Sequence, residues 1–359
     1  MRLIPAPQVL AALALAAAAG LAAGAAGVPL PWLLGPLVVT AVAAMADLRL
    51  AGAPLRLPKS LRDYCVPVIA VTIGATVTPD VATSALRWWP SLLAMALFVV
   101  AVQFANYGLL RRLGGYDRPT AFFAASPGGL IDAVLSGESR GGALAVMSTQ
   151  HFARIAVTVA VVPFLIAAFA EPVGQERAVI AEGIGWPSLT DAIVLIACAV
   201  LGALVGKRLR LPAAVMLGPF VLSAALHVGG LTAAETPLPL VHLAQLVVGG
   251  VLGLQFAGTG KRQVARGVGF AALGVAVALG VAAALSLALT DVVDAPFAAV
   301  FLAFAPGGLA EMGLIAVSLG IEPAFVVVHH LLRIVLTISL APLLFDRLVA
   351  RGSDDGLGD

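Results

Sequence analysis

The chain has 359 residues, of which 61% are hydrophobic and 11% are charged, and its formal net charge is +2. A soluble domain of average composition carries about 25% charged residues, so this composition excludes an ordinary water-soluble globule. The small net charge favours no particular charged partner. Long apolar runs recur along the whole sequence, which indicates that a lipid bilayer solvates the chain.

In chain order, the apolar runs predict ten membrane-spanning helices, because about 20 apolar residues cross a bilayer and a helix satisfies its own backbone there. The first run also has the composition of a signal peptide, but further runs follow it directly, so we interpret it as a span. Two more runs, 119–137 and 298–319, are interrupted by Pro-Gly-Gly. The ten spans are expected at 7–26, 29–46, 64–80, 88–110, 142–170, 188–206, 211–228, 240–257, 267–290 and 323–345.

Lysine and arginine residues in short loops predict the orientation of the spans. The basic clusters are all cytoplasmic if the N-terminus is inside. Loop 111–118 is then inside and loop 171–187 outside, so the chain between them crosses an odd number of times. The run at 119–137 is therefore predicted to enter and return as a re-entrant hairpin, and the same reasoning applies to 298–319. The basic clusters lie at 47–63, 111–118, 207–210 and 261–266.

An internal repeat relates the two halves of the chain. Residues 122–165 align with 301–344 without a gap, and about 16 of the 44 positions are identical. Upstream, "LLGP" at 33–36 matches "MLGP" at 216–219. The charge pattern gives the halves opposite orientations, which is typical of inverted repeats of five spans in secondary transporters. Parallel repeats remain the alternative if the Pro-Gly-Gly segments cross fully as broken helices. The predicted domains are 1–175, 185–349 and a short cytoplasmic tail at 350–359.

Ionisable residues inside the spans are the first candidates for a functional site, because a charge at membrane depth is costly unless it is paired or hydrated. Arg154 lies about 12 residues, or about 18 Å, into its span, near the middle of the bilayer. His151 and Thr158 share its helical face. The second repeat places His330, Arg333 and Thr337 in the same way. A purely structural alternative is that each arginine pairs with a carboxylate, Asp132 or Glu311, and only locks the helices together.

The Pro-Gly-Gly segments supply irregular backbone, which lipid tolerates only inside protein or beside a watery cavity. The helices that follow them present positive N-terminal ends. Two arginines favour an anion, and the carboxylates also allow a zwitterion or a small neutral solute. The carboxylates or histidines could carry a coupling proton, and loop carbonyls could hold Na⁺. The predicted substrate-binding residues are Pro127, Gly128, Gly129, Asp132, His151, Arg154, Thr158, Pro306, Gly307, Gly308, Glu311, His330, Arg333 and Thr337.

The paired "PGGL", "GP" and His-x-x-Arg-Ile motifs, spread over nearly the whole chain, resemble the bacterial AbrB-duplication family of membrane proteins. Its members are often labelled AbrB family regulators or "ammonia monooxygenase". By analogy of fold alone, the broken segments are similar to the re-entrant loops of citrate and glutamate symporters. The tips here read Pro-Gly-Gly-Leu rather than Gly-Gly-x-Gly, so the analogy transfers neither a substrate nor an ion.

The leading prediction is a secondary transporter of a small anionic or zwitterionic solute in the bacterial inner membrane, with both termini cytoplasmic. The alternative is a membrane-embedded regulator that acts through a partner without touching DNA, because the chain has no basic module large enough to grip it. A membrane enzyme is disfavoured, and no cofactor or metal is predicted. The expected partners are the solute, the lipid bilayer and a coupling ion, H⁺ or Na⁺. A homodimer is compatible with this prediction.

Overall fold

The computed structural model describes residues 6–50, 52–169 and 187–349. Its described part is helical except for one short antiparallel strand pair, β1 (Arg49–Leu50) and β2 (Ala53–Pro54), so the predicted all-α class is confirmed. The predicted tail at 350–359, and nearly all of the loop at 171–187 that was used to argue the orientation, lie outside the described residues.

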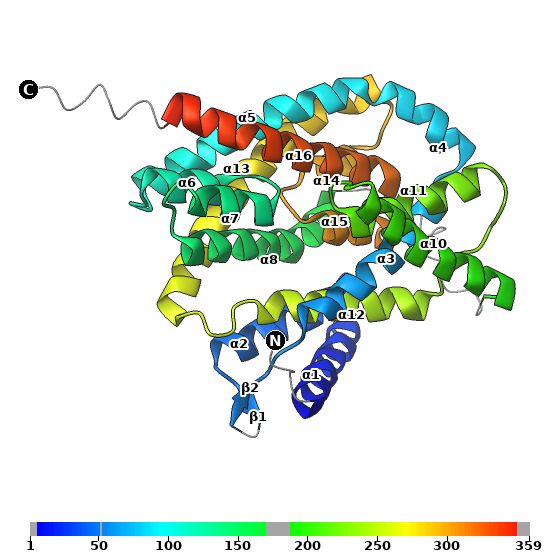
Figure 1. Ribbon diagram of the computed structural model, residues 1–359, viewed down its shortest axis with the longest axis horizontal. Coiled ribbons are helices and arrows are strands. Elements are labelled where there is room, and N and C mark those ends of the chain that lie inside the picture. The colour runs from blue at the N-terminus through cyan, green and yellow to red at the C-terminus, as the bar shows by residue number, and fades with distance from the viewer. Residues whose placement is uncertain (1–5, 51, 170–186, 350–359) are drawn as a thin grey trace, which may run out of the picture. The chain divides into compact units, whose positions relative to one another are not determined.

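The described helices follow one another closely along the chain (Figure 1). In the first half they are α1 (Ala6–Ala25), α2 (Pro31–Met45), α3 (Lys59–Ala75), α4 (Pro79–Ser84), the 3₁₀ helix η1 (Ala85–Arg87), α5 (Trp89–Arg112), α6 (Arg118–Ala125), α7 (Leu130–Glu138) and α8 (Leu144–Phe169). In the second half they are α10 (Leu189–Arg208), α11 (Ala214–Val228), α12 (Leu238–Leu254), α13 (Lys261–Val293), α14 (Phe297–Phe304), α15 (Leu309–Ser318), α16 (Pro323–Leu344) and the π-helix η2 (Phe345–Val349).

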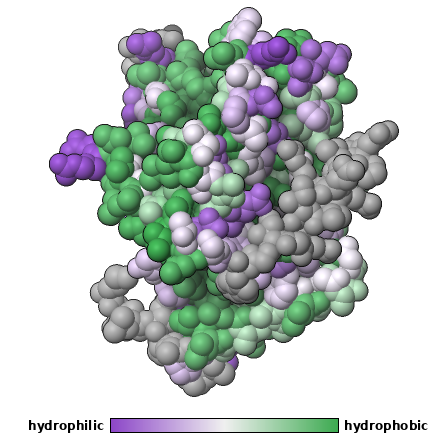
Figure 2. Space-filling model, turned by 90° about the vertical axis from the view of Figure 1, so that its right-hand side faces the viewer, coloured by the Kyte–Doolittle hydropathy of each residue, from purple (hydrophilic) through white to green (hydrophobic). Residues whose placement is uncertain are grey.

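Six of the described helices are long and apolar enough to cross a membrane, namely α1, α5, α8, α10, α13 and α16 with its extension to Val349. Apolar side chains cover much of the face shown in Figure 2, as expected for a chain that meets lipid.

The other predicted spans differ in length or shape. Helices α2, α11 and α12 have 15, 15 and 17 residues, and at about 1.5 Å per residue each is shorter than a hydrocarbon core of about 30 Å. Helix α3 bends by 88° into α4 and η1. The structure therefore indicates a helical membrane protein, with six long spans where ten were predicted.

The chain forms two compact units, and each unit takes segments from both halves of the sequence. The first unit comprises 1–88, 159–259 and 309–327. The second unit comprises 89–158, 260–308 and 328–359. These units cut across the predicted repeats, since every predicted repeat contributes to both of them.

Close helix packing in the first unit depends on glycine. Helix α2 packs on α1 and α12, and α11 packs on α10 and α3. A Cβ atom at Gly35 would fall well inside van der Waals contact with the carbonyl oxygen of Ala19 on α1, and one at Gly218 would do so with that of Gly202 on α10. The repeated "LLGP" and "MLGP" motifs thus let each short helix approach the backbone of the helix before it, as small residues do in membrane bundles.

The second unit contains a broken helix on an aromatic core. Helices α6 and α7 pack against each other and are separated by a turn in which Gly129 has φ 59°, a left-handed conformation that glycine adopts readily. Phe122 packs edge-on against Phe104, Tyr107 and Phe345. The break predicted by the first Pro-Gly-Gly is therefore present.

The second Pro-Gly-Gly also separates two helices, α14 and α15. Here the boundary between the units falls at Gly308, so that α14 belongs to the second unit and α15 to the first. Within the first unit, α15 packs against α3. The two broken segments are alike in sequence, but their second helices belong to different units.

Candidate functional site

The C-terminal end of α6 is held by two side chains from α8. His151 Nε2 lies 3.0 Å from the carbonyl oxygen of Phe123, and Arg154 donates from Nη1 to the carbonyl oxygen of Ser126. Arg154 Nη2 also lies 3.1 Å from His151 Nδ1. Both side chains are buried, with His151 0% and Arg154 8% exposed. The carbonyl oxygen of Ser126, which a broken helix would leave without a partner, is thereby bonded, and that of Phe123 gains a second contact beside the backbone N–H of Ser126 at 3.4 Å.

The end of α14 is held in the same way by α16. His330 Nε2 lies 3.0 Å from the carbonyl oxygen of Leu302, and Arg333 donates from Nη1 to that of Ala305. Arg333 Nη2 lies 3.0 Å from His330 Nδ1 and also donates to the carbonyl oxygen of Gly307. We call each of these arrangements a His–Arg clamp. Three bonds of the first clamp have a counterpart in the second clamp, at positions that the sequence repeat makes equivalent.

The hydrogen bonds of the clamps determine the protonation state of both histidines. A carbonyl oxygen only accepts, so Nε2 of His151 and of His330 carries the hydrogen. A guanidinium group only donates, so each Nδ1 is the acceptor. Both rings are therefore neutral, and a proton added at Nδ1 would break the bond from arginine. This geometry argues against the histidines as carriers of a coupling proton.

The arginines have partners other than the carboxylates considered in the sequence analysis. Arg154 and Arg333 bond to backbone carbonyls and to histidine, where a cation also opposes the partial negative charge of a helix C-terminus. Glu311 pairs instead with Arg62, at 2.8 Å. Asp132 is exposed on α7. The alternative that each arginine pairs with a carboxylate, Asp132 or Glu311, was therefore wrong about the partners. Each arginine does, however, hold the end of a broken helix.

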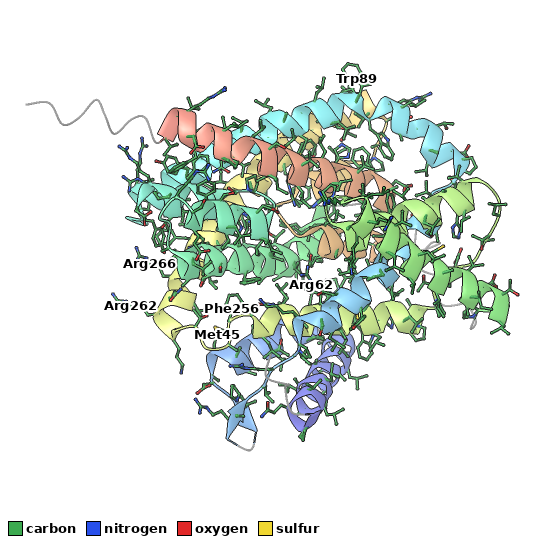
Figure 3. All side chains as sticks on the ribbon, in the orientation of Figure 1. Met45, Arg62, Trp89, Phe256, Arg262 and Arg266 are labelled. Carbon is green, nitrogen blue, oxygen red and sulfur yellow. The ribbon has the colours of Figure 1, made fainter. Side chains whose placement is uncertain are left out.

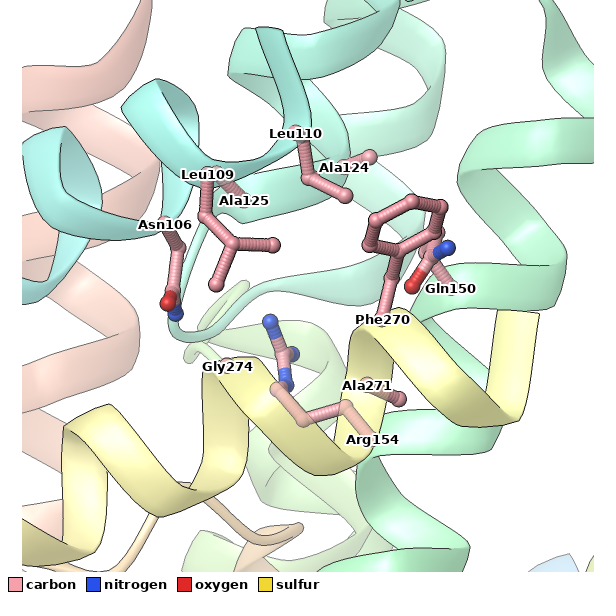
Figure 4. A pocket seen from close by; sticks show the side chains of 10 residues that line it. All are labelled: Asn106, Leu109, Leu110, Ala124, Ala125, Gln150, Arg154, Phe270, Ala271 and Gly274. Atoms are coloured by element: carbon pink, nitrogen blue, oxygen red, sulfur yellow. The ribbon is translucent and has the colours of Figure 1, made fainter. Parts of the chain in front are cut away.

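One cavity in the second unit brings together polar groups that have no hydrogen-bond partner among the described residues. It contains about 300 Å³ of empty space, part of which is open to the outside. Asn106 Oδ1, Gln150 Nε2 and Arg154 Nε are buried there without a hydrogen bond. Figure 4 shows the Arg154 guanidinium group with Asn106 on one side and Phe270 and Gln150 on the other. We call this cavity the Arg154 pocket. Its lining residues are Asn106, Leu109, Leu110, Ala124, Ala125, Gln150, Arg154, Phe270, Ala271 and Gly274.

The Arg154 pocket contains a single formal charge. Its ten lining residues include Arg154 and no carboxylate, so a bound anion would neutralise the site. Sequence reasoning identified Arg154 but missed Asn106, Gln150 and Phe270. The two amides could have been identified from the sequence, because a polar side chain inside an apolar span is energetically costly and is commonly functional. Phe270 could not, since aromatic residues are common in apolar spans.

A second, smaller cavity of about 190 Å³ joins residues from the two repeats. Asp132 and Gly129 line it from the first repeat, and Thr337 lines it from α16 in the second. A Cβ atom at Gly128 would lie 3.3 Å from Thr337 Oγ1, so the tip of the first Pro-Gly-Gly segment is packed on α16. The structure thus unites three predicted site residues here.

The remaining predicted residues line neither cavity. Arg333, His151 and His330 are committed to the clamps, and Thr158 is buried with its hydroxyl unpartnered. Glu311 belongs to the first unit. The turn residues are Pro127, Gly128, Pro306 and Gly307, which are buried, and Gly308, which is half-buried.

The described residues contain no group of three His, Cys, Asp or Glu side chains placed to hold a metal ion. The polar chemistry of the Arg154 pocket is instead that of hydrogen bonding. It offers guanidinium and amide donors, one amide acceptor and an aromatic wall. Such a set suits an anionic group.

Comparisons with known proteins identify a family and two relatives. A family model described as transition state regulatory protein AbrB matches residues 32–349. The chain is 26% identical to the uncharacterized protein YhjN of Bacillus subtilis, over 92% of this chain and 90% of the relative. It is also 26% identical to the "Putative regulator AbrB" of Escherichia coli, over 85% of this chain and 86% of the relative.

Proposed function

Because the chain belongs to the AbrB family and has six helices suited to a membrane, we propose that it is a secondary transporter in the bacterial inner membrane. Its solute is a small anion or zwitterion. The proposal does not follow from the printed names of the relatives, one of which describes a regulator. It rests on the polar groups in the second unit.

The observation that carries the proposal is the unsatisfied polar chemistry of the Arg154 pocket. A buried donor or acceptor without a partner costs about 1–3 kcal/mol, and here three such groups converge on one cavity. A carboxylate would accept from Arg154 Nε and Gln150 Nε2. An ammonium or hydroxyl group on the same solute would donate to Asn106 Oδ1. A bound solute would therefore satisfy all three groups and neutralise the charge.

The two clamps allow binding to be separated from structure. Arg154 and Arg333 both fasten a broken helix, but only Arg154 lines the pocket. Purified protein would be screened against a panel of small carboxylates and amino acids by thermal shift, and the hits would be tested for uptake into liposomes. We expect Gln150→Leu to weaken binding of a hit by about tenfold, equivalent to about 1.4 kcal/mol.

Arg154→Gln should abolish binding, whereas Arg333→Gln should leave the affinity of the folded fraction within about threefold. Folding of each variant would be checked by size-exclusion chromatography. Equal loss of affinity in both arginine variants would refute the assignment of the pocket. Failure of every hit to cross the membrane would refute transport itself.

We also propose that the two halves are inverted repeats of five membrane segments, with both termini in the cytoplasm. The opposite charge patterns of the halves support the inversion, and the equivalent bonds in the two clamps support the repeat itself. Single cysteines would replace Leu113 and Val292, which are 68% and 58% exposed, in a chain lacking Cys65 and Cys198. The two should react with an impermeant thiol reagent from opposite sides of the membrane. Labelling from the same side would contradict inversion.

A second function, regulation through a partner protein, is supported by the name of the Escherichia coli relative. In that case the Arg154 pocket would bind a signal molecule that is not transported. Deletion of the gene would then change gene expression without changing the flux of any hit from the screen. Uptake of a hit that depends on Arg154 would favour transport.

A further inference from the structure

The first unit contains a buried ion pair whose residues belong to neither clamp and line neither cavity. Glu311 lies in the first turn of α15 and is 1% exposed, and Arg62 lies in the first turn of α3 with a side chain that is 38% exposed. Arg62 Nη2 donates to Glu311 Oε1 at 2.8 Å. Figure 3 labels Arg62 at the start of α3. The pair therefore joins a fully buried carboxylate to a cation that reaches the surface.

The pair is incompletely bonded on both sides. Glu311 Oε2 and Arg62 Nε are buried and have no hydrogen-bond partner among the described residues. A guanidinium group that only locked two helices would normally form two parallel bonds to the carboxylate. Here a single bond joins them, and one carboxylate oxygen is left bare. That oxygen is a place where a proton can reside.

Arg62 is the charged side chain that bonds to Glu311 in this unit. On α3, Asp63 and Tyr64 are exposed, and Lys59 lies one turn before Arg62. The neighbours of α15 on α11 and α12 include Met216 and Gln245. The part of α16 that belongs to this unit, 323–327, has no titratable residue.

The histidines of α11 and α12 are engaged elsewhere. His227 Nδ1 lies 2.8 Å from the carbonyl oxygen of Ser223, and its Nε2 lies 3.0 Å from that of Ala234. His242 stacks on Trp32. Glu311 thus has two ways to avoid being a lone buried charge, which are pairing with Arg62 and protonation.

We propose that Glu311 binds and releases the coupling proton, in exchange with Arg62. This inference rests on the proposed transport function. In one state Glu311 is ionised and bonded to Arg62. In the other, a proton from water occupies Oε2, the carboxyl group is neutral, and Arg62 turns to the solvent that its side chain already reaches. Each state avoids an unpaired carboxylate in an apolar interior, which would be costly. Because each alternative replaces the other, proton binding is linked to movement of Arg62.

The sequence repeat sharpens the assignment. The equivalent of Glu311 in the first repeat is Asp132, which is exposed and lines the smaller cavity. The clamp histidines use both ring nitrogens. Among the carboxylates and histidines that the sequence analysis offered as proton carriers, Glu311 is the one that is buried with an unused atom.

The proton itself is the probe for the test. Infrared difference spectra of the full-length protein in lipid nanodiscs would be recorded across a pH titration. Besides the bands of exposed carboxyl groups, we expect the wild type to show a carboxylic-acid C=O band at the higher frequency of a group shielded from water, which grows as the pH falls and is missing in Glu311→Gln. In Arg62→Gln the same band should persist to higher pH, because the ion pair no longer favours the carboxylate. Glu322→Gln, which removes a half-buried carboxylate near the start of α16, should keep the wild-type band.

Several results would overturn the inference. A wild-type spectrum without the C=O band assigned to Glu311 would do so. The same holds if that band survives Glu311→Gln or keeps its pH dependence in Arg62→Gln. Because Arg62→Gln retains Glu311, the pH dependence of the C=O band can be measured in that variant even if Glu311→Gln fails to fold.

Transport measurements distinguish a failure of this inference from a failure of the proposed transport function. With a hit from the solute screen, Glu311→Gln should reduce accumulation driven by a pH gradient by more than tenfold and leave solute exchange within about threefold. Accumulation that is unchanged in this variant would refute proton coupling at Glu311 and leave transport intact. A titrating Glu311 in a protein that moves no solute would refute transport and confine Glu311 to proton binding.

Discussion

The clamps predict a ranked loss of stability when their arginines are replaced. Arg333→Met would remove three hydrogen bonds and leave two acceptors without a donor, the carbonyl oxygen of Gly307 and the Nδ1 atom of His330, because the carbonyl oxygen of Ala305 still accepts from the backbone N–H of Gly307 at 2.9 Å. Arg154→Met would leave two, at Ser126 and His151. A buried unsatisfied acceptor costs about 1–3 kcal/mol, which gives about 2–6 kcal/mol for either variant, and the additional bond from Arg333 to Ala305 adds about 0.5–1.5 kcal/mol.

The measured losses should lie near the lower ends of these ranges. Removing a buried guanidinium group also removes its own cost of desolvation. We therefore expect the free energy of unfolding to fall by about 3 kcal/mol for Arg333→Met and about 2 kcal/mol for Arg154→Met. The order of the two losses is a stricter test than their size, because Arg333 makes one more hydrogen bond than Arg154.

Unfolding would be titrated with SDS in mixed micelles and followed by circular dichroism. Arg49→Gln is the control, because it removes an exposed ion pair with Asp47, and such pairs contribute about 0–1 kcal/mol. If the clamp variants unfolded like this control, the carbonyl bonds would not hold the broken helices. A larger loss for Arg154 than for Arg333 would also contradict the count of bonds.

Two glycine substitutions test the packing and the pocket separately. Gly218→Ala would push a methyl group against the carbonyl oxygen of Gly202, and such overpacking should cost about 1–3 kcal/mol in the same SDS titration. Gly280→Ala is its control, because nothing lies within 4 Å of the new carbon, and a cost there as large as at Gly218 would show that packing is not the cause. Gly274→Ala would place a carbon 3.1 Å from Asn106 Oδ1. We expect it to weaken the binding of a solute identified by thermal shift by about tenfold at little cost in stability, and unchanged affinity would argue that the solute binds elsewhere.

The breaks in α6–α7 and α14–α15 were predictable because Pro-Gly-Gly acts locally. Proline removes a donor and glycine allows the turn. The i, i+3 spacing of His151 and Arg154 likewise placed them on one face. The partner of that face was not predictable, since Ser126 lies 28 positions away and offers a backbone carbonyl, which any residue would offer.

Contacts between distant segments lay beyond sequence reasoning. Arg62 and Glu311 are 249 positions apart, and no periodicity connects them. Asn106 and Phe270 meet in one pocket from helices α5 and α13 for the same reason. Ten spans were predicted and six described helices are long and apolar enough to cross a membrane, because hydropathy does not show where a helix ends. The 15-residue α2 and α11 are apolar enough but short.

The repeats keep one architecture and differ in the side chains that would carry function. Both copies fasten a broken helix with histidine and arginine, and these bonds explain why charged residues can lie in such apolar segments. At aligned positions, however, Gln150 lines the Arg154 pocket while His329 bonds to Ser91 at 2.8 Å. Asp132 is exposed while Glu311 is buried. A transporter that gains work from an ion gradient must bind solute and ion at groups that respond differently. Divergence at these two pairs of positions, on a shared scaffold of clamps, is a direct way for a duplicated chain to acquire that difference.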